Sequence, residues 1–208
     1  MPMLNQKNIF ERFLEQTFHS RAEALLAAFE RYHAWLVSEN AGINLFSRRM
    51  DTDDIWTVHF LDSLLSIGYV DFRGRSVLDF GTGGGLPGFP LAIVFSDAAV
   101  TLLDATKKKI AALMRAAERL ELGNCRFLDQ RIEEVDGQHK FDIIVSRSVK
   151  IEPAYKPILL RLLKPNGKIV LYKSKVLDDV YQFDNTEIFD VDTEAAGIGE
   201  RKIVVARR

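Results

Sequence analysis

A glycine-rich segment, Val77–Gly88 (VLDFGTGGGLPG), constrains the fold more than any other feature of this 208-residue chain. A short apolar run leads into the segment, and an apolar run of helical length follows Pro87. Glycine permits positive φ and lets the backbone pass close to a ligand. Proline suits the first turn of a helix because its missing N–H costs nothing there. The segment therefore predicts a strand, a tight turn and a helix, with a turn that can bind a nucleotide-like ligand.

From residue 74 onward, short apolar segments alternate with segments of helical character. This alternation predicts an α/β fold with a parallel, doubly wound sheet. No convincing helix separates the last two strands, so we expect a terminal hairpin with one antiparallel strand. Seven strands ending in this way are typical of Rossmann-like methyltransferases. The expected strands are 76–80, 100–104, 126–128, 141–146, 168–173, 187–191 and 202–206, and the expected helices are 87–95, 107–121 and 153–163, with a short turn at 131–135.

The N-terminal part of the chain has a different pattern, with apolar residues such as Leu25 and Phe29 at helical spacing. A third helix is expected to begin near residues 51–54, where acidic side chains suit the positive end of the helix dipole. No flexible linker follows these helices. We therefore expect residues 1–72 to form a helical cap on a Rossmann-like domain of residues 73–208.

The charges are balanced overall but unevenly distributed. Lysine and arginine total 28 against 29 acidic residues, so the net charge of −1 gives no global signature of nucleic-acid binding. Residues 140–175, however, contain nine basic residues against only Asp142 and Glu152. This stretch predicts a local basic surface that could attract a polyanion. A solvated helix face with flanking turns is the alternative interpretation.

Several classes of protein are disfavoured by composition. Cys125 is the only cysteine, so neither an internal disulfide nor a multi-cysteine zinc site can form, and we expect it to be a small buried hydrophobic residue. The histidines lack metal-ligand spacing, so no metal site is expected. No apolar run approaches the length of a membrane span, and the N-terminus lacks the apolar block of a secretory signal. We expect a cytoplasmic protein.

The glycine-rich turn is compatible with two kinds of cofactor. Gly83, Gly85 and Gly88 match the G-x-G-x-x-G pattern of dinucleotide sites, so a nicotinamide enzyme is one alternative. Asp79 favours S-adenosylmethionine instead, because a carboxylate can accept hydrogen bonds from the loop near the cationic amino-acid end of that cofactor but is awkward beside a pyrophosphate. Asp104 ends the second strand, where it could accept hydrogen bonds from both ribose hydroxyls. A purely structural turn is the remaining alternative.

Several motifs together resemble one family. The chain is similar to the bacterial small-subunit ribosomal RNA guanine-N7 methyltransferases, the RsmG (GidB) family. The matches follow the family's order over residues 44–205 and include GTGGGLPGFPLAI at 81–93, which is far more specific than a glycine loop alone. The other matches are NL at 44–45, HFLDS at 59–63, TLLD at 101–104, RIEE at 131–134, FD at 141–142, SR at 146–147 and GER at 199–201.

The resemblance implies a Rossmann-like class I fold and transfer of a methyl group from S-adenosylmethionine to N7 of a guanine in the 530 loop of 16S rRNA. It places Gly81 and Leu86 in the cofactor loop, Asp104 near the ribose, and Ile132 and Glu133 at the adenine. Arg147 is expected at the methionine end or at the RNA. With the loop residues considered above, the expected cofactor-binding set is Asp79, Gly81, Gly83, Gly85, Leu86, Asp104, Ile132, Glu133 and Arg147.

The expected chemistry requires positioning more than a base. Guanine N7 has a free lone pair at neutral pH and can attack the methyl group without first losing a proton. The resemblance implies that Arg147, His59 and Asp62 position the reactants, and Lys173 is expected to join them. His59 and Asp62, three residues apart on a helix, could instead simply hydrogen-bond on one face. Lys173 ends a strand at the edge where ligands bind in open α/β sheets.

The expected partner is 16S rRNA presented by the small ribosomal subunit, bound by a monomer with no membrane association. The chain departs from the family pattern at Val58, where the family tends to have arginine, and at Ser148 and Ser174. These departures concern the expected RNA face more than the cofactor loop. Two alternatives stay open: a methyltransferase acting on another RNA or a small molecule, and a non-catalytic ribosome assembly factor.

Overall fold

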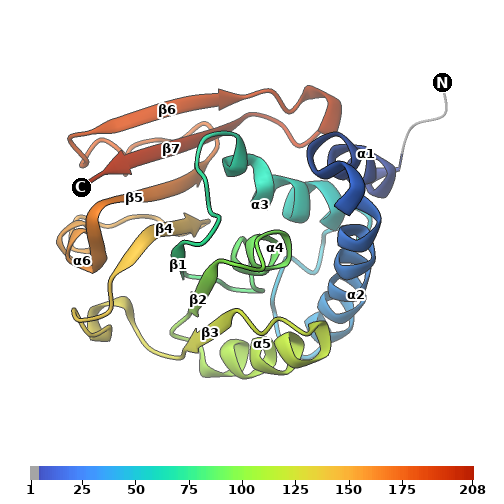
Figure 1. Ribbon diagram of the computed structural model, residues 1–208, viewed down its shortest axis with the longest axis horizontal. Helices are drawn as coiled ribbons and strands as arrows, with labels where there is room; N and C mark the ends of the chain where they lie inside the picture. Colours follow the sequence, from blue (N-terminus) through green and yellow to red (C-terminus); the bar gives the residue numbers. More distant parts are fainter. Residues whose placement is uncertain (1–4) are drawn as a thin grey trace.

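The computed structural model describes residues 5–208 and contains one seven-stranded sheet in the order β3-β2-β1-β4-β5-β7-β6 (Figure 1). Strand β7 runs antiparallel to both β5 and β6, whereas β1 to β5 pair in parallel. The expected mostly parallel sheet and terminal hairpin are confirmed. The strands are β1 Ser76–Phe80, β2 Ala99–Leu103, β3 Cys125–Leu128, β4 Phe141–Arg147, β5 Leu163–Lys173, β6 Thr186–Val191 and β7 Arg201–Arg207.

The strand order reverses between β1 and β4, because β2 and β3 extend the sheet on one side of β1 and β4 begins the other side. In open α/β sheets, ligands bind in the crevice beyond the carboxyl ends of the strands at such a switch point. The carboxyl ends of β1, β2 and β4 are therefore the place to look for a site. Strand β5 begins five residues earlier than expected, where Leu163 pairs with Phe141 ahead of a register shift.

The two faces of the sheet are covered differently. Alternate side chains of each strand point to opposite faces. Val77, Val100 and Val145 join a core that includes α4 and α5, whereas Leu78 and Ile144 join a second core against α6. The helices of this part are α4 Gly88–Val94, α5 Lys107–Leu120 and α6 Tyr155–Leu162, with short 3₁₀ turns η4 Ile132–Glu134 and η5 Glu194–Ala196.

The N-terminal helices pack on the α4–α5 face and share its core (Figure 1). Phe10, Phe29, Tyr32 and Phe60 form aromatic contacts there, and the Tyr32 hydroxyl donates to the Gly84 carbonyl at 2.7 Å. This part comprises α1 Gln6–Phe18, η1 His19–Arg21, α2 Ala22–Asn40, η2 Ile55–Leu61, α3 Asp62–Leu64 and η3 Leu65–Gly68.

The third expected helix is present but irregular. It begins at Ile55 as a π-helical segment, η2, and continues into α3 and η3. Segments of π-helix are frequent at functional sites, and η2 carries His59. Within residues 5–208, no helix combines the length and the apolar character needed to cross a membrane. The first four residues of the expected cap lie outside the described residues.

Candidate active site

The glycine loop lies over the ends of β1 and β2. The backbone N–H groups of Gly81 and Thr82 both donate to the Leu103 carbonyl, at 2.9 and 3.0 Å. Gly81 and Gly83 have φ of +77° and +57°, which side chains with a Cβ rarely adopt. A Cβ on Gly81 would also collide with Val149, which follows β4. The loop therefore needs glycine at position 81 for both conformation and space.

Gly85 and Leu86, both expected at the cofactor, face the interior. A Cβ on Gly85 would lie 2.8 Å from Phe89 and 3.0 Å from the Tyr32 hydroxyl, and Leu86 is buried in the core that the N-terminal helices and α4 share. Their clearest role in the structure is to seat the loop against the N-terminal helices. Gly81 and Gly83 are the partly exposed glycines of this loop.

The Asp79 carboxylate stabilises the glycine loop through hydrogen bonds. It is fully buried, and its Oδ2 atom accepts hydrogen bonds from the Thr82 hydroxyl at 2.5 Å and from the Gly88 N–H at 2.8 Å. The expected bonding of this carboxylate to the loop is confirmed. Burial raises the pKa of Asp79 to about 6, although these two hydrogen bonds oppose the rise. Its Oδ1 atom has no hydrogen-bond partner within the part of the chain that the structure describes.

Asp104 lies next to Gly83 at the carboxyl end of β2. Its carboxylate accepts from the N–H groups of Gly83 at 3.1 Å and Thr106 at 2.8 Å, and the Lys109 ammonium is 3.8 Å away. A carboxylate has about four lone-pair sites. Asp104 therefore keeps acceptor capacity for further donors, such as the two hydroxyls of a ribose.

Ile132 and Glu133 are on η4, beyond the end of β3, and differ in exposure. Ile132 is buried in the core against α6, and Glu133 is exposed. The Glu134 carboxylate accepts from the Arg131 N–H at 3.2 Å and thereby caps the turn. Cys125, on β3, is half-buried rather than fully buried, and burial raises the pKa of its thiol to about 12.

On the other side of the switch point, Asp62 lies between two guanidinium groups. Its Oδ2 atom accepts from Arg147 at 2.8 Å, and its Oδ1 atom accepts from Arg201 at 2.6 Å. Arg147, at the end of β4, also donates to the carbonyls of Val58 and His59. The Val58 interaction uses the backbone, so the departure from the family pattern at this position leaves it intact.

His59 is a neutral member of this cluster. Burial and the neighbouring Arg147 lower the pKa of His59 to about 4. Its Nδ1 atom is 3.3 Å from Arg147 Nη2. A guanidinium only donates, so Nδ1 accepts and the proton resides on Nε2. His59 therefore suits positioning rather than proton uptake at neutral pH.

Lys173 is held by a carboxylate that the sequence did not single out. Asp179 accepts from the Lys173 ammonium at 2.5 Å and from the Ile151 N–H at 2.8 Å. The Gln182 side chain donates to the Ile151 carbonyl at 2.8 Å. The loop after β5 is thus tied to the loop after β4, and Lys173 belongs to an ion pair rather than standing free.

A pocket of about 510 Å³ brings the four expected positioning residues together. The Val149 side chain lines this pocket and also contacts Gly81, so the pocket adjoins the glycine loop. Its lining includes His59, Asp62, Arg147 and Lys173, and also Tyr172, Asp179 and Arg201, which the site prediction missed. The sequence indicates Arg201 only as part of the GER match at 199–201. Because β7 is antiparallel, its first residue lies at the edge where the parallel strands end.

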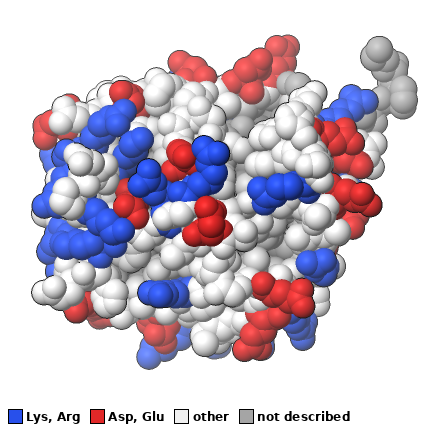
Figure 2. Space-filling model, in the orientation of Figure 1, with Lys and Arg blue, Asp and Glu red and all other residues white. Residues whose placement is uncertain are grey.

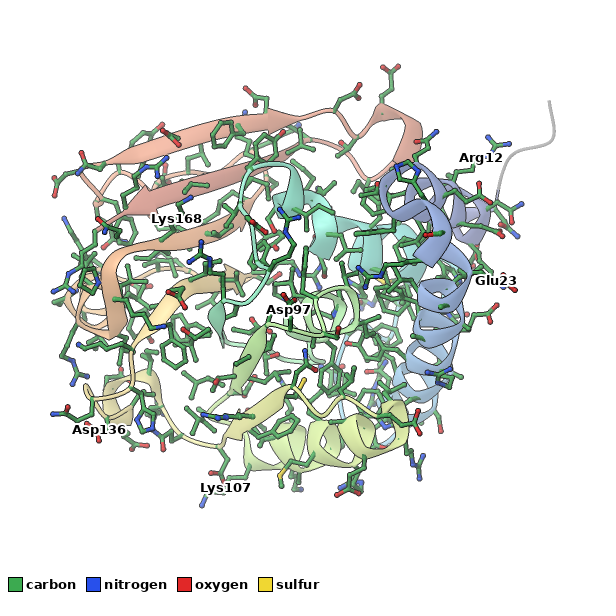
Figure 3. The ribbon with its side chains drawn as sticks, viewed as in Figure 1. Arg12, Glu23, Asp97, Lys107, Asp136 and Lys168 are labelled. Atoms are coloured by element: carbon green, nitrogen blue, oxygen red, sulfur yellow. The ribbon has the colours of Figure 1, made fainter. Side chains whose placement is uncertain are left out.

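The basic residues of the stretch 140–175 lie toward both edges of the sheet. Lys173 pairs in register with Lys202 at the site edge of the sheet, whereas Lys168 pairs with Arg207 towards the opposite edge. Figure 2 shows Lys and Arg gathered where Figure 1 draws β4, β5, β7 and α6, and Figure 3 labels Lys168 there. Arg147 and Lys173 lie at the pocket, and Lys140 and Lys164 lie near strand starts. Consecutive segments of a strand thus carry basic residues to opposite edges, and the local basic surface expected from this stretch stays a prediction.

Among residues 5–208, no group of three His, Cys, Asp or Glu side chains is placed to hold a metal ion.

A family model described as rRNA small subunit methyltransferase G (GidB) matches residues 25–202. The chain belongs to this family. The resemblance inferred from the motifs is thereby confirmed, as are the methyltransferase class and S-adenosylmethionine as cofactor. Membership disfavours the nicotinamide alternative.

Individual relatives agree with the family match. A protein of Syntrophus aciditrophicus named ribosomal RNA small subunit methyltransferase G is 33% identical over 174 residues, covering 82% of this chain and 70% of its own length. One of Porphyromonas gingivalis with the same name is 35% identical over 181 residues, covering 83% and 80%.

Solved structures support the fold alone. The Thermus thermophilus 16S rRNA N2 G1207 methyltransferase in complex with AdoMet and guanosine has a TM-score of 0.53 at 22% identity, covering 72% of this chain and 42% of that one. The pyocyanin biosynthetic protein PhzM has a TM-score of 0.58 at 17% identity, covering 74% and 56%. The Rossmann-like class I methyltransferase fold is confirmed.

Proposed function

We propose that this chain transfers a methyl group from S-adenosylmethionine to N7 of a guanine in the 530 loop of 16S rRNA. The observation that carries the proposal is the family match over residues 25–202, combined with a pocket that adjoins the glycine loop through Val149. The substrate would be rRNA presented by the small ribosomal subunit. We further propose a cytoplasmic monomer in which residues 1–72 act as a cap on the domain of residues 73–208.

The residues at the ends of β1 to β3 fit the cofactor. Gly81 and Gly83 allow its close approach, because their positive φ and missing side chains leave backbone exposed. Asp104 would accept hydrogen bonds from the ribose hydroxyls with its remaining lone pairs. Ile132 and Glu133 would lie at the adenine. When bound, S-adenosylmethionine supplies an electrophilic methyl group on a sulfonium.

The cluster on the other side would hold the target base. Its side chains hydrogen-bond to one another. Asp62 holds the guanidinium groups of Arg147 and Arg201 in place, and Arg147 orients the His59 ring. Such preorganised donors hold a reactant without rearranging during the reaction. The N7 lone pair needs no base, which agrees with the lowered pKa of His59. The target guanine must leave its stack to reach the pocket.

The first test uses S-adenosylmethionine with a labelled methyl group, the protein and unmethylated 30S subunits. The 16S rRNA is digested and the labelled nucleoside identified. Labelled 7-methylguanosine in a fragment containing the 530 loop is the expected product. Label in another nucleoside or another RNA would favour a different substrate. Cofactor and RNA binding without label would favour a non-catalytic assembly factor.

A further inference from the structure

The loop between β5 and β6 carries the two most exposed large apolar side chains among those of residues 5–208. Tyr181 is 72% exposed and Val176 is 66% exposed. Val176 lines the pocket that holds Arg147 and Asp62. Tyr181 follows Asp179, another lining residue, by two positions, which limits their Cα separation to about 7 Å. Exposed apolar groups are thus concentrated beside the candidate active site.

The exposure of Tyr181 is built into a well-anchored loop. Its neighbour Val180 is fully buried against the α6 face, and Phe183 is buried there at 4% exposure. Gln182 donates to the carbonyls of Ile151 and Asp179, at 2.8 and 2.7 Å. Because the residues on both sides are fixed, the ring of Tyr181 is presented to solvent from a defined backbone position.

Both basic and acidic side chains surround this ring, and most of the acids are paired with lysines. Lys175 on the same loop and Lys150 on the adjoining β4–α6 loop are exposed, and Lys150 lies 3.5 Å from the carboxylate of Glu152. The acids Asp179 and Asp184 are paired with Lys173 and Lys156, and Asp178 lines the pocket. Aromatic rings flanked by basic side chains are the usual platform for unpaired bases, since every base has a face that can stack.

We propose that Tyr181 stacks on an unpaired base next to the target guanine, with Lys175 near the phosphate backbone. The proposal rests on the proposed function, because it assigns a neighbouring nucleotide of that same RNA to this loop. The partner is single-stranded RNA rather than a ribosomal protein. Stacking needs the ring and not the hydroxyl, so phenylalanine or tryptophan can replace tyrosine.

The direct test is Tyr181→Trp, titrated with a short purine-rich single-stranded RNA while tryptophan emission is recorded. The native Trp35 and Trp56 are almost completely buried, at 6% and 5% exposure, and provide a steady background. Stacking is expected to quench the new emission in a salt-dependent manner. Met114→Trp is the matched control, because Met114 is 49% exposed on α5, which contributes no lining residue to the pocket. Its emission should not change.

Substitutions of Tyr181 measure how much the stacked ring contributes to RNA affinity. Tyr181→Ala should weaken binding of the same RNA by a factor of about 5 to 100, the effect of losing one stacked base. Tyr181→Phe should retain wild-type affinity, as should the control Ile188→Ala on β6. In methylation of 30S subunits, Tyr181→Ala should raise KM with little change in kcat.

Three results would overturn the proposal: unchanged emission of the Tyr181→Trp variant while methylation proceeds, wild-type RNA affinity for Tyr181→Ala, or an effect seen with intact subunits but not with RNA alone. The last would indicate a contact with ribosomal protein. Failure of the proposed function would give a different result. RNA would still quench the emission of the Tyr181→Trp variant, but no 7-methylguanosine would form.

Discussion

The two sides of the switch point are held together by different kinds of contact. On the β1–β2 side, backbone N–H groups of one continuous loop make the main contacts, to the Leu103 carbonyl and the Asp104 carboxylate. On the β4–β5–β7 side, the contacts join side chains from distant parts of the chain, such as Asp62, Arg147 and Arg201. The first construction depends on local conformation and the second on long-range packing, so changes to each should have separable effects.

The largest effect is expected at Asp62. Asp62→Ala leaves two partly buried guanidinium groups without their shared carboxylate, and breaking such a buried ion pair costs about 4 kcal/mol. We expect the free energy of unfolding to fall by about this amount and methyl transfer to be lost, while cofactor affinity changes little. Chemical denaturation and calorimetry measure the two quantities. Glu118→Ala, at an exposed position of α5, is the control. Loss of cofactor affinity in step with stability would show that the two sides are not separable.

Asp79 and His59 should respond to pH in opposite directions. Burial raises the pKa of Asp79 from 3.8 to about 6, so its stabilising contribution is present below pH 4 and is lost as pH rises to about 6. Burial lowers the pKa of His59 from 6.5 to about 4, so its contribution is present above pH 6.5 and is lost as pH falls towards 4. Each shift corresponds to about 3 kcal/mol.

Denaturation of Asp79→Asn and His59→Gln between pH 4 and 7 measures these contributions. Relative to wild type, Asp79→Asn should gain stability as pH rises, and His59→Gln should gain stability as pH falls. Differences from wild type that are independent of pH would contradict both assignments.

Gly81→Ala should act on the cofactor side alone. The substitution combines a φ of +77° with a collision against Val149, so we expect cofactor affinity to fall by about a hundredfold. Calorimetric titration with S-adenosylmethionine measures the change. Gly123→Ala, where a Cβ has open space, should bind as wild type. An equal loss in both variants would rule out a specific role for position 81.

Asp104→Ala should weaken cofactor binding by about thirtyfold, because it removes a charged acceptor of hydrogen bonds. The fold should persist, since the carboxylate is at the sheet edge rather than in the core. Circular dichroism and calorimetry test the two expectations together. Near-unchanged affinity would exclude Asp104 as the ribose ligand.

The smallest effect concerns lysines at the two edges. Lys150→Ala, beside the pocket, should weaken RNA binding a few-fold and reduce its salt dependence by about one unit of log–log slope. Lys168→Ala, at the opposite edge, should change neither. Filter binding across a salt series measures both. An equal effect of Lys168→Ala would extend the RNA path around the molecule.

The same contrast between local and long-range contacts decides which features can be predicted from the sequence. The strands around Val77–Gly88, the turn and the bond from the loop to Asp79 were predictable, because they depend on neighbouring residues. The ion pair between Asp62 and Arg201 was not predictable, because 139 residues separate them and only the sheet order brings them together. The tie between Lys173 and Asp179 is close in sequence, but no motif indicates it.

The basic stretch shows the same difference in another form. The composition identifies the basic residues, yet Lys168 and Lys173 reach different edges because an extended strand advances about 3.3 Å per residue. A linear count of charges cannot distinguish one surface from two. Strand direction and register are needed, and both are set by pairing with distant segments such as β7.

The carboxylate of Asp179 joins two loops of the site at a single atom. One oxygen atom accepts from Lys173, at the end of β5, and from the Ile151 N–H in the β4–α6 loop. Donors from two different loops thus share one acceptor atom, which joins the end of β5 to the β4–α6 loop. Val149 is two residues from Ile151 and touches Gly81. Residues 149–151 of the β4–α6 loop therefore meet both the glycine loop and the loop after β5, which makes this short segment the shared boundary of the two halves of the site.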